Sequence, residues 1–449
     1  MKSKRVSLKK VIVWLVSLFF LLLGFVVENH ALVLSLVLAY SLLISLLFSR
    51  ISILDPRSLF VIMLAIYSTW FPLQVVIFGY EGPLTIDSSA LLATIRLQMF
   101  GIVVFVLVCT AIINERKVAV SRGLFFYGLS AARVELPSEK VIFWPVLLFV
   151  LFAMIVTAGG GYTTKREILD AGSALKNIAE LFFYFLLVIV MLSSLRGGGR
   201  LVTYKAVLVF ALGLGYFLLL GERDVFFRIA VLMFLLFVEK KNIPAFLSVL
   251  FVVSVAVVVT PVSQGFKAFF LSGDTGFAGL DLRLIFSNEF ISASRNLYSL
   301  VYYGVDHSFS FLINDVLRAF VPSAFISAIG IQSTGSWFDT IYRLENGFQG
   351  TSGWGFTIIG QGYLVSGCFG IFFVMTVIAT IVSLLYRLAY KGQYYYVFYL
   401  LALTTYIYII RADLANLLSQ VFKIGGLAVI GVYIAHCFFN NLKFSMAAR

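Results

Sequence analysis

The sequence predicts an all-α protein: a polytopic transmembrane helical bundle of about 12 spans with one long extracytoplasmic loop. Hydrophobic residues make up 61% of the 449 residues and charged residues only 12%, too few to coat a water-soluble particle of this size. Apolar runs of about 17 to 25 residues recur along the chain, and a helix needs roughly 20 residues to cross the hydrocarbon. A transmembrane barrel would instead show ~10-residue stretches of alternating polarity, which the chain lacks.

Twelve apolar segments are expected to be spans. They cover residues 11–27, 31–48, 58–79, 93–113, 141–158, 178–195, 205–220, 225–239, 244–262, 357–386, 394–410 and 422–440. Helices 1–9 thus occupy residues 1–260, a large extracytoplasmic loop residues 261–356, and helices 10–12 residues 357–449. Because stretches of this loop such as 309–313 and 320–331 are apolar, it is expected to contain interfacial or re-entrant helices that cap a cavity.

The distribution of lysine and arginine predicts that both termini are cytoplasmic. An even number of spans places the termini on one side, and with that side inside, 21 of the 34 basic residues fall in cytoplasmic segments. The N-terminal run Val11–Val27 is long and lacks a small-residue cleavage site, so a retained first helix is expected rather than a signal peptide.

Several function classes are disfavoured by the residues present. The net charge of +13 does not indicate nucleic-acid binding, because the basic residues punctuate the spans rather than gather on one surface. The three cysteines lie in apolar runs and the three histidines do not cluster with carboxylates, so no metal site and no cofactor is expected. The chain carries no phosphate loop, zincin motif or nucleophile elbow, and it shows no internal two-fold repeat.

Arginines on the predicted outer side are the strongest functional signal. They oppose the usual charge bias, and the set comprises Arg166, Arg223, Arg295, Arg318, Arg343 and Arg411. A planar guanidinium binds phosphate through two parallel hydrogen bonds and stays protonated. The set therefore indicates a phosphate-bearing ligand near the outer interface.

Two of these arginines lie in distinctive local patterns. Gly221–Asp224 joins two apolar helices through four residues, which holds Arg223 near the bilayer surface; Asp224 and Arg228 are four apart and are expected to pair unless Asp224 only caps the helix. After Arg411, polar side chains recur at spacings i, i+3 and i+7, namely Asp413, Asn416 and Gln420. Such a stripe predicts a helix facing a cavity, or alternatively a helix lying flat at the interface.

The long loop interleaves polar and aromatic side chains. His307 is a candidate for a general base, although a lone histidine is also common on protein surfaces. Glu289 is among the polar residues of this loop. Tryptophan and tyrosine faces beside carboxylates suit sugar binding, but the same residues concentrate at membrane interfaces. Both interpretations stay open at this point.

Four features together resemble the Wzy-type polymerases of lipid-linked oligosaccharide repeat units, over about residues 155 to 425. They are the Gly-Gly-Gly-Tyr loop that leads to Arg166, the Gly-Glu-Arg-Asp turn at 221–224, the glycine-rich stretch Gly350–Tyr363 before a span, and Arg411-Ala-Asp. Many members carry an acidic residue near the position of Gln361, and its absence here leaves no catalytic role predicted for that position.

The resemblance implies a metal-independent glycosyltransferase that uses no nucleotide sugar, located in a bacterial cytoplasmic (inner) membrane. Undecaprenyl-pyrophosphate-linked oligosaccharide would be both donor and acceptor, and a chain-length-regulating co-polymerase is an expected partner. Arg223 and Arg411 would stabilise the departing diphosphate. Arg166, Arg295 and Arg343 are expected secondary contacts, with Asp413 and Tyr363 also on the substrate. The base is left open among Asp224, Glu289, His307 and Glu345.

Two alternatives remain. An O-antigen ligase has a similar topology and the same leaving group, and usually pairs an arginine with a histidine in its large loop, as His307 allows. A flippase of the same lipid-linked repeat also fits twelve spans, although flippases tend to have paired halves and short loops.

Overall fold

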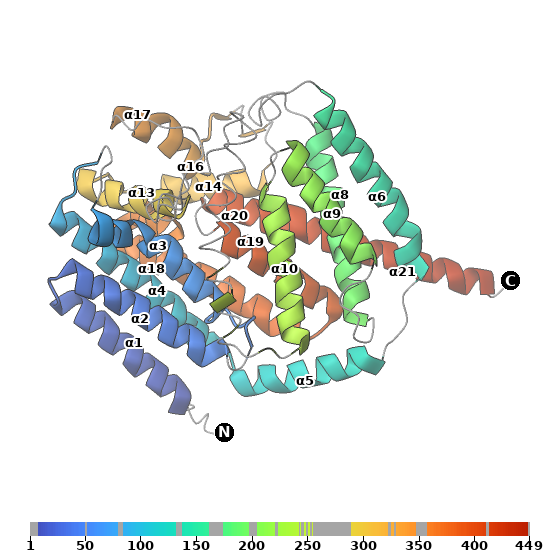
Figure 1. The fold of residues 1–449 in the computed structure, drawn as a ribbon, viewed down its shortest axis with the longest axis horizontal. Coiled ribbons are helices and arrows are strands. Elements are labelled where there is room, and N and C mark those ends of the chain that lie inside the picture. Colours follow the sequence, from blue (N-terminus) through green and yellow to red (C-terminus); the bar gives the residue numbers. More distant parts are fainter. Residues whose placement is uncertain are drawn as a thin grey trace. The chain divides into compact units, whose positions relative to one another are not determined.

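The structure is a computed structural model in which helices account for the secondary structure of the residues described (Figure 1). It describes residues 8–49, 52–79, 84–131, 137–160, 174–196, 204–220, 223–241, 289–321, 329–346, 357–409 and 413–447, with isolated residues at 243–254 and 325–326. The chain divides into two compact units. Unit 1 comprises residues 1–114, 243–384 and 409–419, and unit 2 comprises residues 115–242, 385–408 and 420–449.

The predicted all-α class is confirmed, and the predicted spans recur as helices wherever they are described. Seven of the described helices are long and apolar enough to cross a membrane: Leu8–Val26, His30–Ser49, Leu59–Phe78, Ser88–Ile112, Ile178–Leu195, Ile358–Ala389 and Leu414–Phe438. Two shorter apolar helices cover Val141–Thr157 and Tyr204–Gly215. The predicted span at 244–262 lies outside the described residues apart from isolated positions. The number of about 12 spans therefore stays a prediction.

Unit 1 is built on four long helices: α1 (Leu8–Val26), α2 (His30–Ser49), α3 (Leu59–Phe78) and α4 (Ser88–Ile112). Helix α3 is the most enclosed, because every residue from Leu59 to Pro72 is buried. Helix α13 (Glu289–Tyr303), from the long loop, packs on α3 and α4. Pro72 disturbs the hydrogen-bond ladder of α3, and the Phe71 N–H is donated instead to Ser294 Oγ of α13 at 2.9 Å. Helix α13 of the long loop thus belongs to the core of unit 1.

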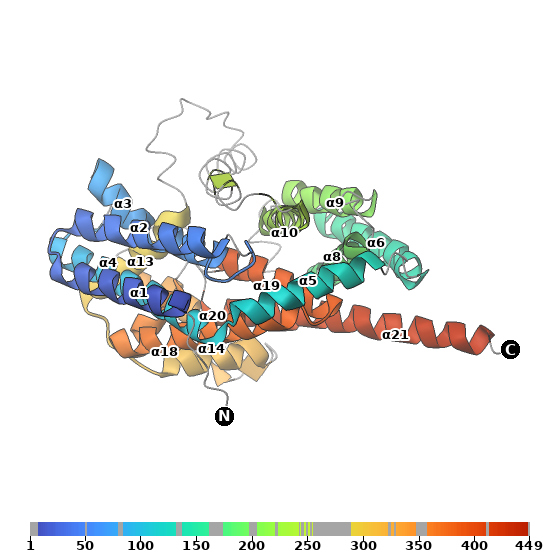
Figure 2. The ribbon, with the colours of Figure 1, turned by 90° about the horizontal axis from the view of Figure 1, so that it is seen from below.

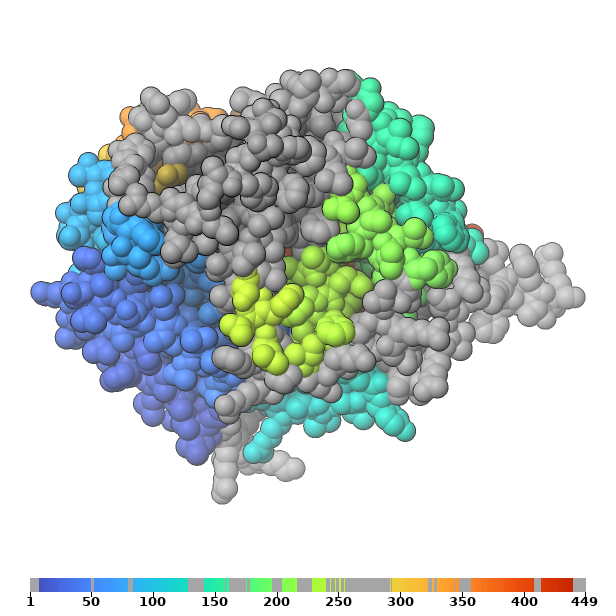
Figure 3. All heavy atoms as spheres, in the orientation of Figure 1, coloured from blue at the N-terminus to red at the C-terminus, as the bar shows by residue number. Residues whose placement is uncertain are grey.

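The outward face of α1 has the apolar composition of a surface that contacts lipid. The visible atoms of this helix are dark blue in Figure 3. Large apolar side chains are exposed along its length: Leu15, Leu18, Phe19, Leu22 and Phe25. A contiguous apolar patch of this extent would be unusual in water. Hydrocarbon is the solvent that fits it.

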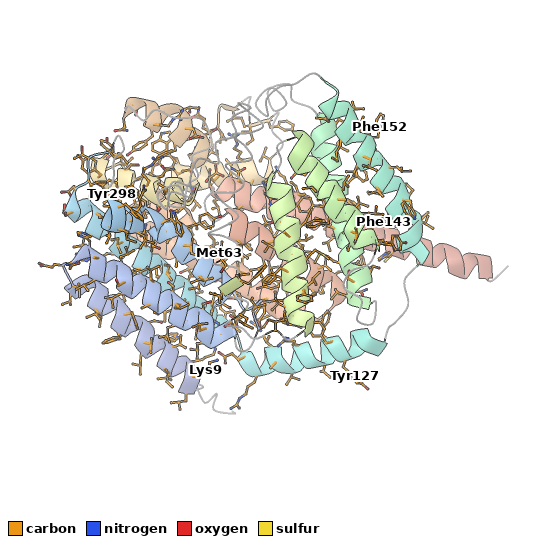
Figure 4. All side chains as sticks on the ribbon, in the orientation of Figure 1. Lys9, Met63, Tyr127, Phe143, Phe152 and Tyr298 are labelled. Carbon is orange, nitrogen blue, oxygen red and sulfur yellow. The ribbon has the colours of Figure 1, made fainter. Side chains whose placement is uncertain are left out.

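The two ends of this helix group carry different sets of contacts. At one end Lys10 donates to the Ala111 carbonyl at 3.1 Å, and Lys9, labelled in Figure 4, lies over the Phe48 ring. At the other end Arg96 donates to three carbonyls at the end of α1, and Tyr298 (Figure 4) donates to the Thr85 carbonyl at 2.8 Å. Segments predicted to share one side of the membrane therefore lie at one end, whereas the assignment of that side to the cytoplasm stays a prediction.

The short connection between α2 and α3 differs from the solvated cytoplasmic loop that the sequence predicts. Arg57 is fully buried and forms two hydrogen bonds with Asp55, at 2.9 Å and 2.7 Å, while its guanidinium lies 3.6 Å from the Phe48 ring centroid. Asp55 is also buried. A buried guanidinium needs this pairing, because burial of either charge alone costs several kcal/mol.

Unit 2 is a separate group of helices. It contains α5 (Glu115–Ala131), α6 (Pro137–Ala158), α8 (Ala174–Arg196), α9 (Tyr204–Leu220), α10 (Arg223–Lys241), most of α19 (Gln393–Ile409) and α21 (Leu427–Ala447), as labelled in Figures 1 and 2. Helices α6, α8 and α9 pack on one another, α10 packs on α9, and α21 packs on α8. Exposed apolar side chains such as Phe152 on α6 point outward (Figure 4).

Helix α5 lies between the predicted spans 93–113 and 141–158, in a segment for which the sequence predicts no span. Arg122 forms an ion pair at 2.6 Å with Glu239 of α10, whose side chain is 2% exposed. The Tyr390 hydroxyl donates to the same carboxylate at 3.2 Å. Three segments predicted to lie on one side of the membrane therefore meet at this carboxylate.

Candidate functional site

Helix α18 (Ile358–Ala389), predicted as one continuous span, is broken near its start. Ser366 has φ −167° and ψ 45°, and Gly367 has φ 55° and ψ −134°, so neither residue is helical. A Cβ atom on Gly362 would lie only 2.6 Å from the Ile371 Cα, and one on Gly370 would meet the Gly362 carbonyl oxygen. Residues eight apart in a continuous helix are about 12 Å apart. Residues 358–365 therefore form a half-helix that folds back on the rest of α18 through close glycine contacts.

His307 lies against this break. The turn that carries it is anchored to the half-helix, because the Ser308 N–H donates to the Leu364 carbonyl at 2.9 Å. The imidazole packs edge-on against the Tyr363 ring at 4.8 Å, and its Nε2 is 3.2 Å from the position a Cβ on Gly367 would take. His307 is nevertheless exposed. The structure thus brings together two predicted site residues that are 56 positions apart in the chain.

Helix α14 (Ser310–Phe320) buries a carboxylate and exposes a stripe of large apolar side chains. The stripe comprises Phe309, Ile313, Val316, Leu317 and Phe320. Asp315 is fully buried, whereas Arg318, in the last turn, is exposed. The apolar stripe fits a helix whose outer face meets lipid, and an arginine near a helix end can extend to the interface.

Asp315 is held by the start of α16 (Thr334–Trp337). The Thr334 N–H donates to Asp315 Oδ1 at 2.8 Å, and the Thr334 hydroxyl donates to Oδ2 at 3.1 Å. Gln361 of the half-helix donates to the Thr334 hydroxyl oxygen at 2.8 Å. All three side chains are buried. Asp315, Thr334 and Gln361 thus form a hydrogen-bonded chain from α14 to α18.

Asp413 completes this group, which we call the acid cluster (Asp315, Thr334, Gln361 and Asp413). The Gly335 N–H donates to Asp413 Oδ2 at 3.1 Å, so consecutive amides of α16 bind the two different carboxyl groups. A Cβ on Gly335 would lie 2.7 Å from that oxygen, which explains the glycine. The Leu414 N–H points to Gln361 Oε1 at 3.5 Å. Figure 2 shows α14 and α20 (Leu414–Leu418) side by side, as their contacts require.

The acid cluster can hold a proton near neutral pH. Burial, and then the nearby Asp413 carboxylate, raise the pKa of Asp315 from 3.8 to about 7, although hydrogen bonds from Thr334 and Gln361 oppose the shift. Asp315 lies outside the seven candidate spans. Perturbed carboxyl pKa values of this kind concentrate at functional sites.

The predicted stripe of Asp413, Asn416 and Gln420 does not lie on one regular helix. Asp413 instead caps α20: the Asn416 N–H and Nδ2 both donate to Asp413 Oδ1, at 2.8 Å and 2.7 Å. The backbone then becomes π-helical over Ser419–Gly426, where Gln420 lies. The i, i+3, i+7 spacing assumed a regular helix that included Asp413, and its carboxylate instead satisfies the free amides of a helix start.

Two arginines of the long loop that are predicted substrate contacts, Arg295 and Arg343, lie on neighbouring helices. Arg295 is half-buried on α13, and Arg343 is half-buried at the start of α17 (Arg343–Glu345). The two helices are connected because Tyr342, adjacent to Arg343, donates its hydroxyl to the Ser299 carbonyl of α13 at 3.0 Å. Contact of either arginine with a phosphate stays a prediction.

The other predicted residues are described less fully. Arg223 and Asp224 begin α10 in unit 2, and Glu289 begins α13; these three are described by their backbone alone. Arg166 and Arg411 lie outside the described residues. A shared pocket for Arg223 and Arg411 therefore stays a prediction.

Arg228 has a described side chain, and it donates to the Tyr184 hydroxyl at 2.6 Å. Its pairing with Asp224 stays a prediction.

The sequence predicted no individual role for Asp315, Thr334 or Gln361. A usable signal existed for Asp315, since it is a carboxylate opposite an apolar stripe in a segment already expected to meet the membrane. In lipid the polar face of such a helix points inward. Thr334 and Gln361 reach this site through tertiary contacts, which no pattern in the sequence predicts.

The described residues define a helical protein with the helices of a multi-pass membrane protein and a broken helix beside a buried acid cluster. No protein-family model, curated protein or solved structure matches the chain.

Proposed function

We propose that the chain is a membrane glycosyltransferase that polymerises undecaprenyl-pyrophosphate-linked oligosaccharide repeat units at the outer face of the cytoplasmic membrane. The observation that carries the proposal is the position of His307. It is an exposed histidine on the long loop, fixed against the break in α18 by Tyr363 and by the Ser308–Leu364 hydrogen bond. A general base needs both access to substrate and a fixed orientation.

The proposed step moves the growing glycan onto the incoming repeat. An acceptor hydroxyl oxygen forms a bond to the anomeric carbon of the donor, the bond from that carbon to the diphosphate breaks, and the hydroxyl proton passes to His307. Undecaprenyl pyrophosphate leaves with the bonding electron pair. Arg223 and Arg411, with Arg166, Arg295 and Arg343, would bind the diphosphate as its negative charge grows. The resemblance to Wzy-type polymerases supports this assignment.

The test uses the full chain in vesicles with lipid-linked single repeats extracted from a strain that lacks the gene. The wild type is expected to lengthen the glycan, whereas Arg223→Ala, Arg411→Ala and His307→Ala each lose at least about 100-fold of the rate while inserting normally. Arg→Lys variants should recover little activity, because an ammonium cannot form the bidentate contact. Full activity of both arginine variants would remove the diphosphate assignment.

Loss of the gene separates polymerase from ligase. A polymerase deletion leaves a single repeat unit on the cell surface, whereas a ligase deletion leaves none.

A flippase of the same lipid-linked repeat is the second candidate, and the broken helix is the observation that favours it. Discontinuous helices beside buried carboxylates line the substrate paths of many transporters. Wild-type vesicles that move the lipid-linked repeat across the bilayer but make no longer glycan would replace the polymerase proposal with this one.

A further inference from the structure

Aromatic rings gather on the long loop where α13 ends. Tyr302 and Tyr303 are 37% and 43% exposed. Tyr303 contacts Tyr342 edge-on at 6.4 Å, and Tyr342 lies 5.3 Å from Trp337, which is half-buried. We propose that Tyr302, Tyr303 and Trp337, here called the aromatic shelf, bind the sugar rings of the oligosaccharide. This inference rests on the proposed function and names the part of the substrate that the long loop holds.

The shelf is fixed before any ligand arrives. Tyr302 stacks on Tyr298 at 5.8 Å with an interplanar angle of 18°. The Tyr298 hydroxyl in turn donates to the Thr85 carbonyl and accepts from the Asp87 N–H, both at 2.8 Å. Rings held in this way lose little conformational entropy when a ligand binds.

Trp337 is supported from the other side. Its ring lies 4.7 Å from Phe311 of α14, and Tyr342, behind it, is fixed by its hydrogen bond to the Ser299 carbonyl. The shelf therefore rests on three helices of unit 1: α13, α14 and η1 (Phe338–Tyr342).

The polar groups beside the shelf favour a sugar over lipid. Gly304, with φ 63°, ends α13 and starts a turn in which Asp306 and His307 are both exposed. A carboxylate facing hydrocarbon would cost about 3 kcal/mol. Sugars bind where aromatic faces meet the C–H faces of the pyranose and carboxylates accept hydrogen bonds from its hydroxyls.

A direct comparison within the same loop strengthens the distinction. The exposed stripe of α14 contains residues such as Ile313 and Phe320, without a tyrosine, tryptophan or carboxylate. That stripe has the composition of a lipid contact. The α13 end of the shelf, Tyr302 and Tyr303, comes seven and six residues before Phe309 and has hydroxyl-bearing rings followed by the charge of Asp306. His307 shares the turn, so a glycan on the shelf would extend toward the proposed base.

The test measures binding without catalysis. The probe is the water-soluble oligosaccharide released by mild acid from the single-repeat lipid extract, titrated calorimetrically into the purified full chain. The double variant Tyr302→Ala, Tyr303→Ala is expected to bind about 20-fold more weakly, since each lost ring contact removes a stacking interaction. The double Tyr→Phe variant keeps the rings and should bind within about twofold of wild type. Tyr395→Ala, which removes an exposed tyrosine of unit 2, is the matched control.

Each outcome bears on the shelf separately from the polymerase. Weaker binding by the alanine variant alone supports the shelf, even if wild-type vesicles make no longer glycan. Equal binding by all variants, or no binding to wild type, overturns the shelf, even if the wild type polymerises. A shelf that served as a membrane anchor would instead show unchanged oligosaccharide binding together with lower thermal stability in vesicles, and this result also overturns the inference.

Discussion

Replacement of Asp315 by asparagine is expected to flatten the pH dependence of stability. The asparagine oxygen can still accept from the Thr334 N–H, and its amide, in the place of Oδ2, can donate to the Thr334 hydroxyl oxygen, so the hydrogen-bonded frame of the acid cluster is largely kept. What the variant loses is the titrating proton. The comparison therefore isolates the effect of that proton on stability.

The magnitude follows from the shifted pKa. The pKa of Asp315 rises from 3.8 to about 7 in the fold. Between these values the unfolded chain has released the proton and the folded chain has kept it, so the free energy of unfolding falls as pH rises through this range. The difference between the two pKa values corresponds to about 4 kcal/mol in all, of which about 3 kcal/mol is lost between pH 5 and pH 8. Asparagine contributes no such change.

The assay is thermal unfolding of the full chain in detergent, followed by tryptophan fluorescence at pH 5 and pH 8. The wild type should lose several degrees of melting temperature at pH 8 relative to Asp315→Asn, after each is normalised at pH 5. Asp306→Asn removes an exposed carboxyl from the neighbouring turn and serves as the control. Parallel pH profiles for wild type and Asp315→Asn would contradict this prediction, because they would mean that Asp315 has the same pKa in the folded and the unfolded chain.

Two further substitutions test the packing of unit 1, by melting temperature and by yield of inserted protein. Gly362→Ala places a Cβ 2.6 Å from backbone and should destabilise the chain by about 1–3 kcal/mol or more, whereas Gly123→Ala, with nothing within 4 Å, should change little; equal effects would contradict the folded-back half-helix. Arg57→Ala should cost about 3–5 kcal/mol because it leaves the Asp55 carboxylate buried and unpaired. Exposed Arg116→Ala should stay within about 0.5 kcal/mol, and a similarly small loss for Arg57 would show that its pair is solvated.

Hydropathy predicted the helices well because lipid imposes one rule on the backbone. An apolar run long enough to cross the hydrocarbon must satisfy its amides internally, so its structure follows from its length. The predicted span 394–410 appears as Gln393–Ile409, and 205–220 appears as Tyr204–Leu220. Hydropathy did not predict helix α5, because its sequence is too charged for a span. Its Arg122 forms an ion pair with Glu239 of α10.

Two features could not be predicted from periodicity alone: the break in α18 and the burial of Asp315 on α14. The run 357–386 is apolar throughout, and hydropathy does not distinguish one long helix from two that fold back. The glycines at 360, 362, 367 and 370 were the available signal. For α14, the spacing predicts that Asp315 lies on the side opposite the apolar stripe. Whether that side is buried or exposed depends on whether water or lipid surrounds the helix.

The candidate site divides in the same way. His307 and Tyr363 were predicted from their residue types, and they are in contact. Asp315 and Thr334 meet only because α16 packs against α14, so that the Thr334 N–H reaches the Asp315 carboxylate. Residue type can nominate a base or a ring. It cannot supply the hydrogen-bond partners that hold a buried acid.

The outward apolar face of α14 has a practical consequence for anyone who wishes to study the long loop by itself. Residues 261–356 look like an ectodomain in length, yet a fragment cut at those positions would present Ile313 and Phe320 to buffer and leave Asp315 without Gln361 and Asp413. Such a fragment would be expected to aggregate rather than refold. Antibodies, crystals and ligand screens directed at this region will need the whole chain in a lipid or detergent particle.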